Sequence, residues 1–449
     1  MKKFILLLAA FAMIVSACSN AKTADNSATG AATNSSDSAS AAAGTNAAPV
    51  EIEFWHAMGG ELGTVLQQQI DKFNQSQTEV LVKPVFQESY DVTGQKLQAA
   101  VVGGSVPDIV QLNTRVWPAF ANNGALLSLD DYMNNDPDFD FADMKKGLLV
   151  NTALNGKQYT LPYNRSTPIL YYNKDIMKET GLNPEDPVKT WDDLQAAAKK
   201  ATIVKNGKIE RFGFAASMSG WYDYSMIWSN GGDVLGPDMK TVLLDKPEAA
   251  RGLQLWVDMV NKDKTMMPPL GGTSTGGASA GQTLNTSFYN GQVAFFISST
   301  ADLASMSSNV KFQLGATFLP KFNEYATPTG GANLAIMAKA PKEKQDAAWK
   351  FIKFMTSTEQ TIFFSQKSGY LPVRESAEKS PEMQSYYTAN PLFTVALKQL
   401  DYAKEVPSLE HTKRIETEMN KAMEKAVTSN IPAEQAMKEA ADNIRKFLK

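Results

Sequence analysis

The chain has 449 residues, with 44 Lys and Arg against 47 Asp and Glu, and a formal net charge of −3 at pH 7. Removal of Lys2 and Lys3 with a signal segment would take that charge to −5. A slightly acidic chain without a basic run argues against nucleic acid or an anionic membrane surface as its main partner. About four hundred residues follow Val50, which is more than one hydrophobic core usually serves, so we expect two lobes.

The N-terminus has the pattern of a bacterial lipoprotein signal. Lys2 and Lys3 precede an apolar run over 4–15, and small residues lead to Cys18, the only cysteine. The run is too short to span a bilayer as a finished helix but has the length of a secretory signal core. We therefore predict a signal peptide over 1–17 and acylation of Cys18 as the first mature residue. The alternative is a chance single cysteine.

The segment that follows has the composition of a tether. Residues 19–48 are almost entirely Ser, Ala, Thr, Asn, Gly and Asp, and none of them is aromatic or a large aliphatic residue that could join a core. We expect 18–49 to be a disordered tether with a reach of roughly 30 Å. The domain would then be held outside the cytoplasm, on the periplasmic side or the surface of the bacterial cell membrane.

The rest of the chain alternates strands and helices. Residues 50–55 alternate as a strand, apolar residues over 62–73 recur at helical spacing, and 80–86 and 108–112 are typical of strands. Thr190 and Asp193 form a capping box for a helix through residue 201, Asp245 and Pro247 open another helix, and Pro432 begins a terminal one. No internal repeat or second low-complexity linker occurs. This pattern predicts an α/β fold whose lobes are joined by several short crossings, with the ligand cleft between them.

Signals of catalysis are weak. His56 and His411 have no partner at ligand spacing, so neither a metal site nor a nucleophilic triad is indicated. The glycine-rich stretch 271–277 lacks the lysine of a phosphate loop and is better interpreted as a loop. We predict no catalytic residue, no metal and no cofactor. A pair of glycosidase carboxylates is not identified by any spacing, although Asp and Glu are numerous enough to form one.

The sequence instead favours recognition of a polyhydroxylated ligand. Residues 217–224 (Ser-Met-Ser-Gly-Trp-Tyr-Asp-Tyr) combine aromatic rings with small hydroxyls, and they lack helical or strand periodicity. Aromatic faces cover the C–H surface of a sugar or polyol, while side-chain oxygens and amides pair with its hydroxyls. The alternative is that these rings belong to the core, which is as plausible as binding for Trp228 but less so for Trp221, which follows a glycine.

Three stretches carry a family resemblance: 54–63 (FWHAMGGELG), 164–175 (NRSTPILYYNKD) and 367–373 (KSGYLPV). They resemble the family-1 extracellular solute-binding proteins of ABC importers, and within these the members that bind glycerol 3-phosphate. The resemblance implies a two-lobed periplasmic-binding-protein fold, type II-like, with three crossings near 163–167, 297–300 and 330–334. It places 50–166 and about 297–332 in the N-terminal lobe, and 167–296 and about 333–449 in the C-terminal lobe.

The same resemblance implies the residues of the ligand site. The matching positions are Tyr90, Thr114, Ser166, Trp221, Ser299, Gly331 and Tyr370. Two departures bear on the ligand: Thr114 stands where the family has a glutamate, and the expected arginine falls near Pro407. Arginine is the usual bidentate partner of a phosphate. Arg165 is a candidate for the missing anion partner, and the alternative is that it lies on the surface.

The implied function is capture of a small molecule, with no catalysis. We expect a monomer that binds glycerol 3-phosphate, a glycerophosphodiester or a related polyol or sugar, and that delivers it to ABC permease subunits. An oligosaccharide-binding subunit is the nearest alternative. A lipid-anchored carbohydrate-active enzyme and a surface adhesin are the alternatives from other classes; the first needs two facing carboxylates and the second a large exposed apolar patch.

Overall fold

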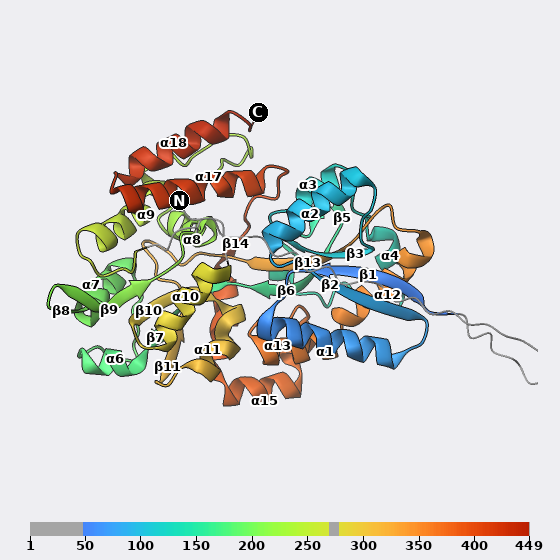
Figure 1. Cartoon of the computed structure of the whole chain (residues 1–449), viewed down its shortest axis with the longest axis horizontal. Helices are drawn as coiled ribbons and strands as arrows, with labels where there is room; N and C mark the ends of the chain where they lie inside the picture. Colours follow the sequence, from blue (N-terminus) through green and yellow to red (C-terminus); the bar gives the residue numbers. More distant parts are fainter. Residues whose placement is uncertain (1–47, 269–277, 449) are drawn as a thin grey trace, which may run out of the picture. The chain divides into compact units, whose positions relative to one another are not determined.

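The computed structural model describes residues 48–268 and 278–448, which lie in one compact unit (Figure 1). Cys18, nearly all of the predicted tether and the glycine-rich stretch 271–277 lie outside the described residues. Two five-stranded sheets organise this unit, each with its own hydrophobic core. We call the first sheet with its helices the first lobe, and the second sheet with its helices the second lobe.

The first sheet has the order β2-β1-β3-β13-β6. The strand β1 pairs in parallel with β2 and β3, whereas β13 runs antiparallel to both β3 and β6. The strands predicted over 50–55, 80–86 and 108–112 are therefore confirmed as neighbours. Their bounds are β1 Val50–His56, β2 Val80–Phe86, β3 Ile109–Asn113, β6 Leu161–Ser166 and β13 Gly330–Ile336.

The second sheet has the order β11-β7-β10-β9-β8. The central strand β10 is parallel to β9 and antiparallel to β7. The bounds are β7 Pro168–Asn173, β8 Ile203–Lys205, β9 Lys208–Ala215, β10 Val293–Ser299 and β11 Leu314–Thr317. Two short pairs complete the strands: β4 Ala153–Leu154 with β5 Lys157–Gln158, and β12 Thr327–Pro328 with β14 Ala403–Lys404.

Helices pack on both sheets (Figure 1). Those of the first lobe are α1 Gly60–Ser76, α2 Tyr90–Gly103, α3 Trp117–Asn122, α4 Asp130–Asn135, α5 Lys146–Leu149, α12 Lys342–Met355, α13 Thr358–Ser368, α14 Glu375–Lys379 and α15 Pro381–Ala389. Those of the second lobe are α6 Lys174–Glu179, α7 Trp191–Ala201, α8 Gly220–Ser229, α9 Pro247–Asn261, α10 Ala278–Tyr289, α11 Leu303–Asn309, α17 Thr412–Ser429 and α18 Ala433–Arg445. Near the junction of the lobes lie the short helices η2 Thr300–Asp302, η3 Pro391–Phe393, α16 Thr394–Gln399 and η4 Leu400–Tyr402.

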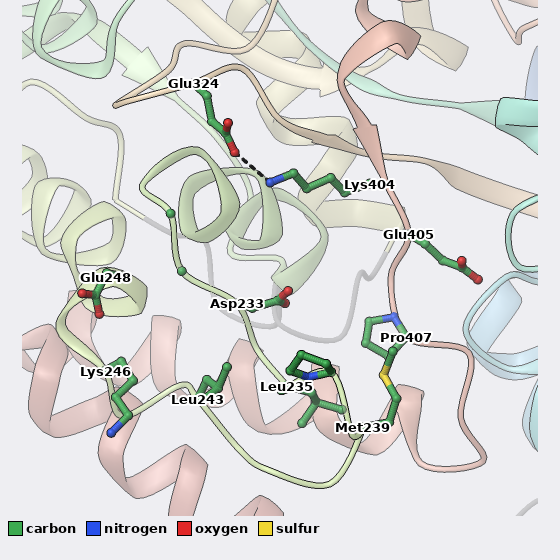
Figure 2. A pocket seen from close by; sticks show the side chains of 14 residues that line it. Asp233, Leu235, Met239, Leu243, Lys246, Glu248, Glu324, Lys404, Glu405 and Pro407 are labelled. Atoms are coloured by element: carbon green, nitrogen blue, oxygen red, sulfur yellow. Dashed lines mark hydrogen bonds and ion pairs between the residues drawn. The ribbon is translucent and has the colours of Figure 1, made fainter.

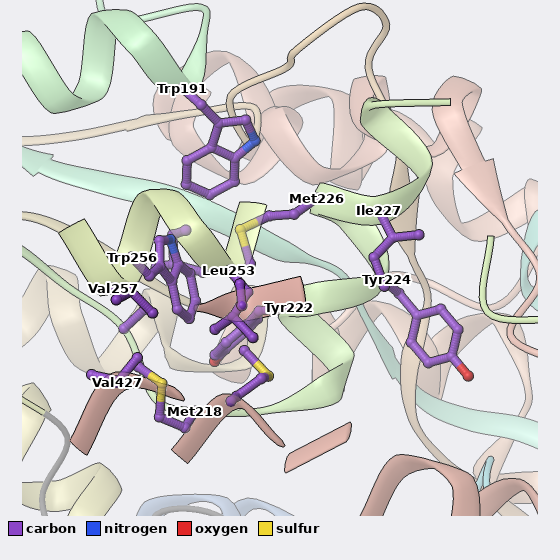
Figure 3. Packing of buried hydrophobic residues seen from close by; sticks show 14 of the residues in the cluster. Trp191, Met218, Tyr222, Tyr224, Met226, Ile227, Leu253, Trp256, Val257 and Val427 are labelled. Carbon is purple, nitrogen blue, oxygen red and sulfur yellow. The ribbon is translucent and has the colours of Figure 1, made fainter. Parts of the chain in front are cut away.

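The core of the second lobe is rich in aromatic and methionine side chains (Figure 3). Trp191 and Trp256 are fully buried and meet edge to face with ring centroids 6.4 Å apart. Helices α17 and α18 close this core, and α18 buries Met437 and Ile444 as the sequence predicted. The capping box of Thr190 with Asp193 is confirmed at the start of α7.

The stretch 217–224 is one place where the structure differs from the expectation. Residues from Gly220 onward form helix α8, although they show no helical periodicity in sequence. The helix is covered on nearly every side, so hydrophobic and polar positions do not alternate along it. Trp228 on α8 is 2% exposed and belongs to the core.

The lobe boundaries expected from the sequence are wrong in two segments. The strand β10, expected to cross into the first lobe, pairs with β7 and β9 in the second sheet. The strand β13 pairs in the first sheet, and helices α12 and α13 pack on the core of that lobe. The chain therefore passes between the sheets at 166–168, as expected, at 317–330, and between Ala396 and Val406, which belong to the two different cores.

Candidate functional site

The first crossing brings two predicted residues side by side. Ser166 at the end of β6 pairs with Gly330, and Gly331 pairs with Arg165. Gly331 has a φ of 92°, and a Cβ atom there would stand 1.8 Å from the carbonyl oxygen of Asn164. Only glycine fits this close approach of two backbones. The N–H of Thr114, just beyond β3, donates to the Gly331 carbonyl over 3.3 Å.

Trp221 from the second lobe lies against the same glycines. It is the second residue of α8, whose N-cap Ser219 accepts a hydrogen bond from the Trp221 N–H. A Cβ atom on Gly330 would lie 2.6 Å from the indole ring, and the indole Nε1 donates to the Thr329 carbonyl over 3.3 Å. The ring is half-buried. It therefore forms a wall where the second lobe meets the strand that crosses into the first.

A polar network on the first lobe holds the two predicted tyrosines. The Asn164 amide donates to the Tyr90 hydroxyl over 2.6 Å and accepts from the Gln111 amide over 2.9 Å. The Tyr370 phenol belongs to the same network, where it interacts electrostatically with Tyr90. Burial raises the pKa of both phenols, so both stay protonated at neutral pH and can donate.

Ser299 completes the set from the second lobe. It ends β10 opposite Pro168, and its hydroxyl accepts from the Ala301 N–H over 3.1 Å. A Cβ atom on Gly369, whose φ is 109°, would stand 2.2 Å from the Thr300 carbonyl, so the segment before Tyr370 lies directly on the residue after Ser299. Contacts of these kinds bring the seven predicted positions to the junction of the two lobes.

Arg165 is fully buried at the same junction, so the alternative of a surface arginine is wrong. One terminal nitrogen donates to Asn333 Oδ1 over 3.0 Å; the other donates to Thr329 Oγ1 over 2.8 Å and to the Val150 carbonyl over 3.3 Å. Burial lowers the pKa of Arg165 to about 9, which leaves it charged at neutral pH. Its two terminal nitrogens thus donate to protein oxygens from three segments, whereas its buried Nε has no hydrogen-bond partner within the described residues.

Sequence reasoning missed a second arginine and its partner. Arg115 follows Thr114 directly, and its Nε lies 2.5 Å from Glu416 Oε2 on α17, so the pair joins the two lobes. Glu416 is 2% exposed, and its side chain lies against Gly220. A Cβ atom on Gly220 would be only 3.1 Å from Cγ of Glu416. The position next to Thr114 was a signal for Arg115. Nothing in the charged stretch around His411 singled out Glu416.

A groove and a pocket lie near this junction. A groove of about 410 Å³ lies between α2 and α3 of the first lobe and α17 of the second; Asp91, Arg115, Glu410 and Lys413 supply its charges. A pocket of about 530 Å³ in the second lobe includes Pro407 (Figure 2). Its Lys404 is paired with Glu324 over 2.8 Å. None of the seven predicted positions lines this pocket.

Two carboxylates lie near the rings of α8: Asp302, which is partly exposed, and Asp223, which is fully buried. Asp302, at the end of η2, accepts a hydrogen bond from the Ser298 hydroxyl over 2.5 Å, and burial raises its pKa. Asp223 on α8 is fully buried, and within the described residues neither of its oxygens has a hydrogen-bond partner. Burial raises the pKa of Asp223 to about 8. Both groups can therefore carry a proton under conditions where an exposed carboxyl would not.

Over 48–268 and 278–448, no three His, Cys, Asp or Glu side chains gather in a way that could hold a metal ion. No helix in these ranges has the length and apolar character needed to cross a bilayer.

Comparison with known proteins decides the family. A model described as bacterial extracellular solute-binding protein matches residues 68–394, most of the chain. The chain belongs to this family. The sn-glycerol-3-phosphate-binding periplasmic protein UgpB of Yersinia pestis bv. Antiqua is 30% identical over 369 residues, which cover 79% of this chain and 81% of the relative.

Solved structures agree with this solute-binding protein in fold. UgpB from Mycobacterium tuberculosis in complex with glycerophosphocholine is 28% identical with a TM-score of 0.78, over 89% of this chain and 98% of that one. Maltose-bound MalE3 of T. maritima is 25% identical with a TM-score of 0.76, over 89% and 100%. The predicted two-lobed fold and the prediction of a binding protein of an ABC importer, not an enzyme, are thus confirmed. The family acts outside the cytoplasm.

Proposed function

We propose that this solute-binding protein is the lipid-anchored subunit of an ABC importer that captures glycerol 3-phosphate, a glycerophosphodiester or a related polyol or sugar between its lobes. One observation carries the proposal: seven positions of suitable chemistry, far apart in sequence, meet where the chain crosses between the sheets. The relatives named for glycerol 3-phosphate and glycerophosphocholine support the ligand class.

Each residue of the proposed site has a role that suits its type. The hydroxyls of Tyr90, Thr114, Ser166, Ser299 and Tyr370 donate to or accept from ligand oxygens. The Gly331 backbone approaches the ligand closely because it carries no side chain, and the Trp221 ring covers the C–H face of the ligand.

Capture works through the hinge. Ligand contacts drawn from both lobes form together only when the cleft is shut, so binding shifts an open-to-closed equilibrium toward the closed form. The crossing segments are the places that absorb the change in backbone angles. The permease subunits then recognise the closed form of a monomeric binding protein.

The anchor of this protein is Cys18, at the end of the lipoprotein signal. Several acyl chains on one residue hold a protein to a membrane stably, since each buried CH₂ contributes about 0.8 kcal/mol. Mass spectrometry of the membrane-extracted protein should find an acylated N-terminal Cys18. An unmodified N-terminus upstream of this residue would contradict the anchor.

A neutral oligosaccharide is the second candidate ligand. It is favoured by the half-buried Trp221 ring and by the maltose-bound structure of similar fold. A thermal-shift screen separates the two classes, because a ligand that binds only the folded state raises the melting temperature. We expect stabilisation by glycerol phosphates or glycerophosphodiesters. Stabilisation by oligosaccharides alone would replace the proposed ligand class with sugars.

A further inference from the structure

The strongest unassigned feature is the group of charges that joins the lobes beside the proposed site. Arg115 and Glu416 pair across the junction, and Lys413 on α17 lies 2.9 Å from Asp91 on α2 and 3.9 Å from Glu416. The formal charges of these four side chains, two cations and two anions, add up to zero. All but Glu416 line the 410 Å³ groove.

Arg115 is placed to act on the ligand. It follows Thr114, whose N–H donates to the Gly331 carbonyl, and its partner Glu416 lies against Gly220, the residue before Trp221. Its Nε faces Glu416, whereas within the described residues no hydrogen bond engages its two terminal nitrogens. Arg165 differs, because protein oxygens already occupy its terminal nitrogens. A guanidinium with two parallel N–H groups available is suited to a phosphate.

Glu416 sets a limit on the charge of that phosphate. It is nearly inaccessible to solvent, so its negative charge is weakly screened and repels any anion that Arg115 binds. A phosphate monoester carries close to two negative charges at pH 8, and a phosphodiester carries one. Glu410 lines the same groove and adds a further negative charge. A bound monoester adds two more negative charges to this group, whereas a diester with a cationic substituent adds no net charge.

We propose that Arg115 and Glu416 together determine charge specificity: Arg115 binds the phosphate, and Glu416 selects a phosphodiester, best one carrying a compensating cation, over a phosphate monoester. This inference rests on the proposed function, because it assumes a phosphate-bearing ligand in the inter-lobe site. It assigns the anion partner to a residue other than Arg165.

Titration calorimetry of the mature protein at pH 8 with glycerophosphocholine, glycerophosphoglycerol and glycerol 3-phosphate tests the proposal. The wild type should bind the two diesters more tightly than the monoester, and glycerophosphocholine most tightly. Arg115→Gln should lose about tenfold or more in affinity for all three, since a charge-assisted hydrogen bond is removed. Glu416→Gln should bind the monoester more tightly relative to glycerophosphocholine, by about tenfold.

Lys96→Gln is the matched control, because Lys96 lies on helix α2, as Asp91 does, but forms an exposed ion pair with Glu88. It should leave all three affinities unchanged. Removing one partner of a pair can prevent folding, so thermal unfolding is recorded for each variant. The double variant Arg115→Gln/Glu416→Gln leaves no unpaired charge, and it should bind all three phosphates weakly with little discrimination.

The outcomes separate the two claims. Wild-type affinity in the folded Arg115→Gln or double variant would overturn the charge-specificity proposal while the proposed function stands. An unchanged preference in Glu416→Gln would overturn the role of Glu416. Failure of the wild type to bind any of the three phosphates would refute the proposed ligand class, and this proposal with it.

Discussion

At the scale of single residues, Asp223 is the buried group with the clearest consequence for stability. Its carboxyl has a pKa of about 8 in the folded protein, far above the value near 4 of an unfolded chain. Between these values the folded state binds more protons than the unfolded state, so this group makes the free energy of unfolding fall as pH rises. The contribution of the Asp223 carboxyl to the free energy of unfolding is therefore fully present only below about pH 4 and is lost as the pH rises toward 8.

We therefore predict that Asp223→Asn raises the free energy of unfolding at pH 8, on the order of 3 kcal/mol, and flattens its fall between pH 5 and 8. Urea denaturation at several pH values measures both effects. The exposed Asp401→Asn is the control and should change neither. An equally steep fall in Asp223→Asn would mean that another group causes it.

Arg165 gives a second prediction at this scale. Arg165→Gln leaves Asn333 and Thr329 without their buried partner, so the free energy of unfolding should fall on the order of 3 kcal/mol. Chemical denaturation measures the loss. A variant of wild-type stability that binds phosphate ligands tenfold more weakly would instead make Arg165 the anion partner that the sequence suggested.

At the scale of elements, helix α8 carries both Trp221 and Trp228, which provide a matched pair of substitutions. Trp221→Ala should keep the fold and lower ligand affinity by about tenfold or more, roughly 1.4 kcal/mol, because the ring lies at the junction and is only half-buried at the edge of the core. Trp228→Ala should instead lower stability by about 3 to 5 kcal/mol, since that ring is buried. Calorimetry and thermal unfolding separate these effects. Equal affinity in Trp221→Ala would assign that ring to packing.

The same helix illustrates which elements the sequence could predict. Strand β1 alternates between one buried and one open face, and α18 buries a single stripe, so periodicity identified both. Helix α8 is covered on nearly all sides, and its sequence therefore lacks the stripe that marks a helix. The prediction that Trp221 contacts the ligand came from the cluster of rings and hydroxyls and did not depend on periodicity.

At the scale of the whole molecule, local patterns predicted two lobes but not which strand joins which sheet. The strand β13 pairs with β3, more than two hundred residues earlier, and no local signal encodes that partner. The same limit explains why Glu416 was missed: it meets Arg115 only because α17 returns to the junction. Of the seven positions proposed for the site, only Ser166 and Tyr370 lie in the continuous motifs that carry the resemblance.

The central claim is that the inter-lobe site of this solute-binding protein captures a glycerol phosphate compound, and wild-type calorimetry tests it most directly. The mature protein is titrated with glycerophosphocholine, with glycerol 3-phosphate and with maltotriose. We predict saturable one-to-one binding of glycerophosphocholine, weaker binding of glycerol 3-phosphate and none of maltotriose. Saturable binding of maltotriose, with no heat from either glycerol phosphate, would contradict the account.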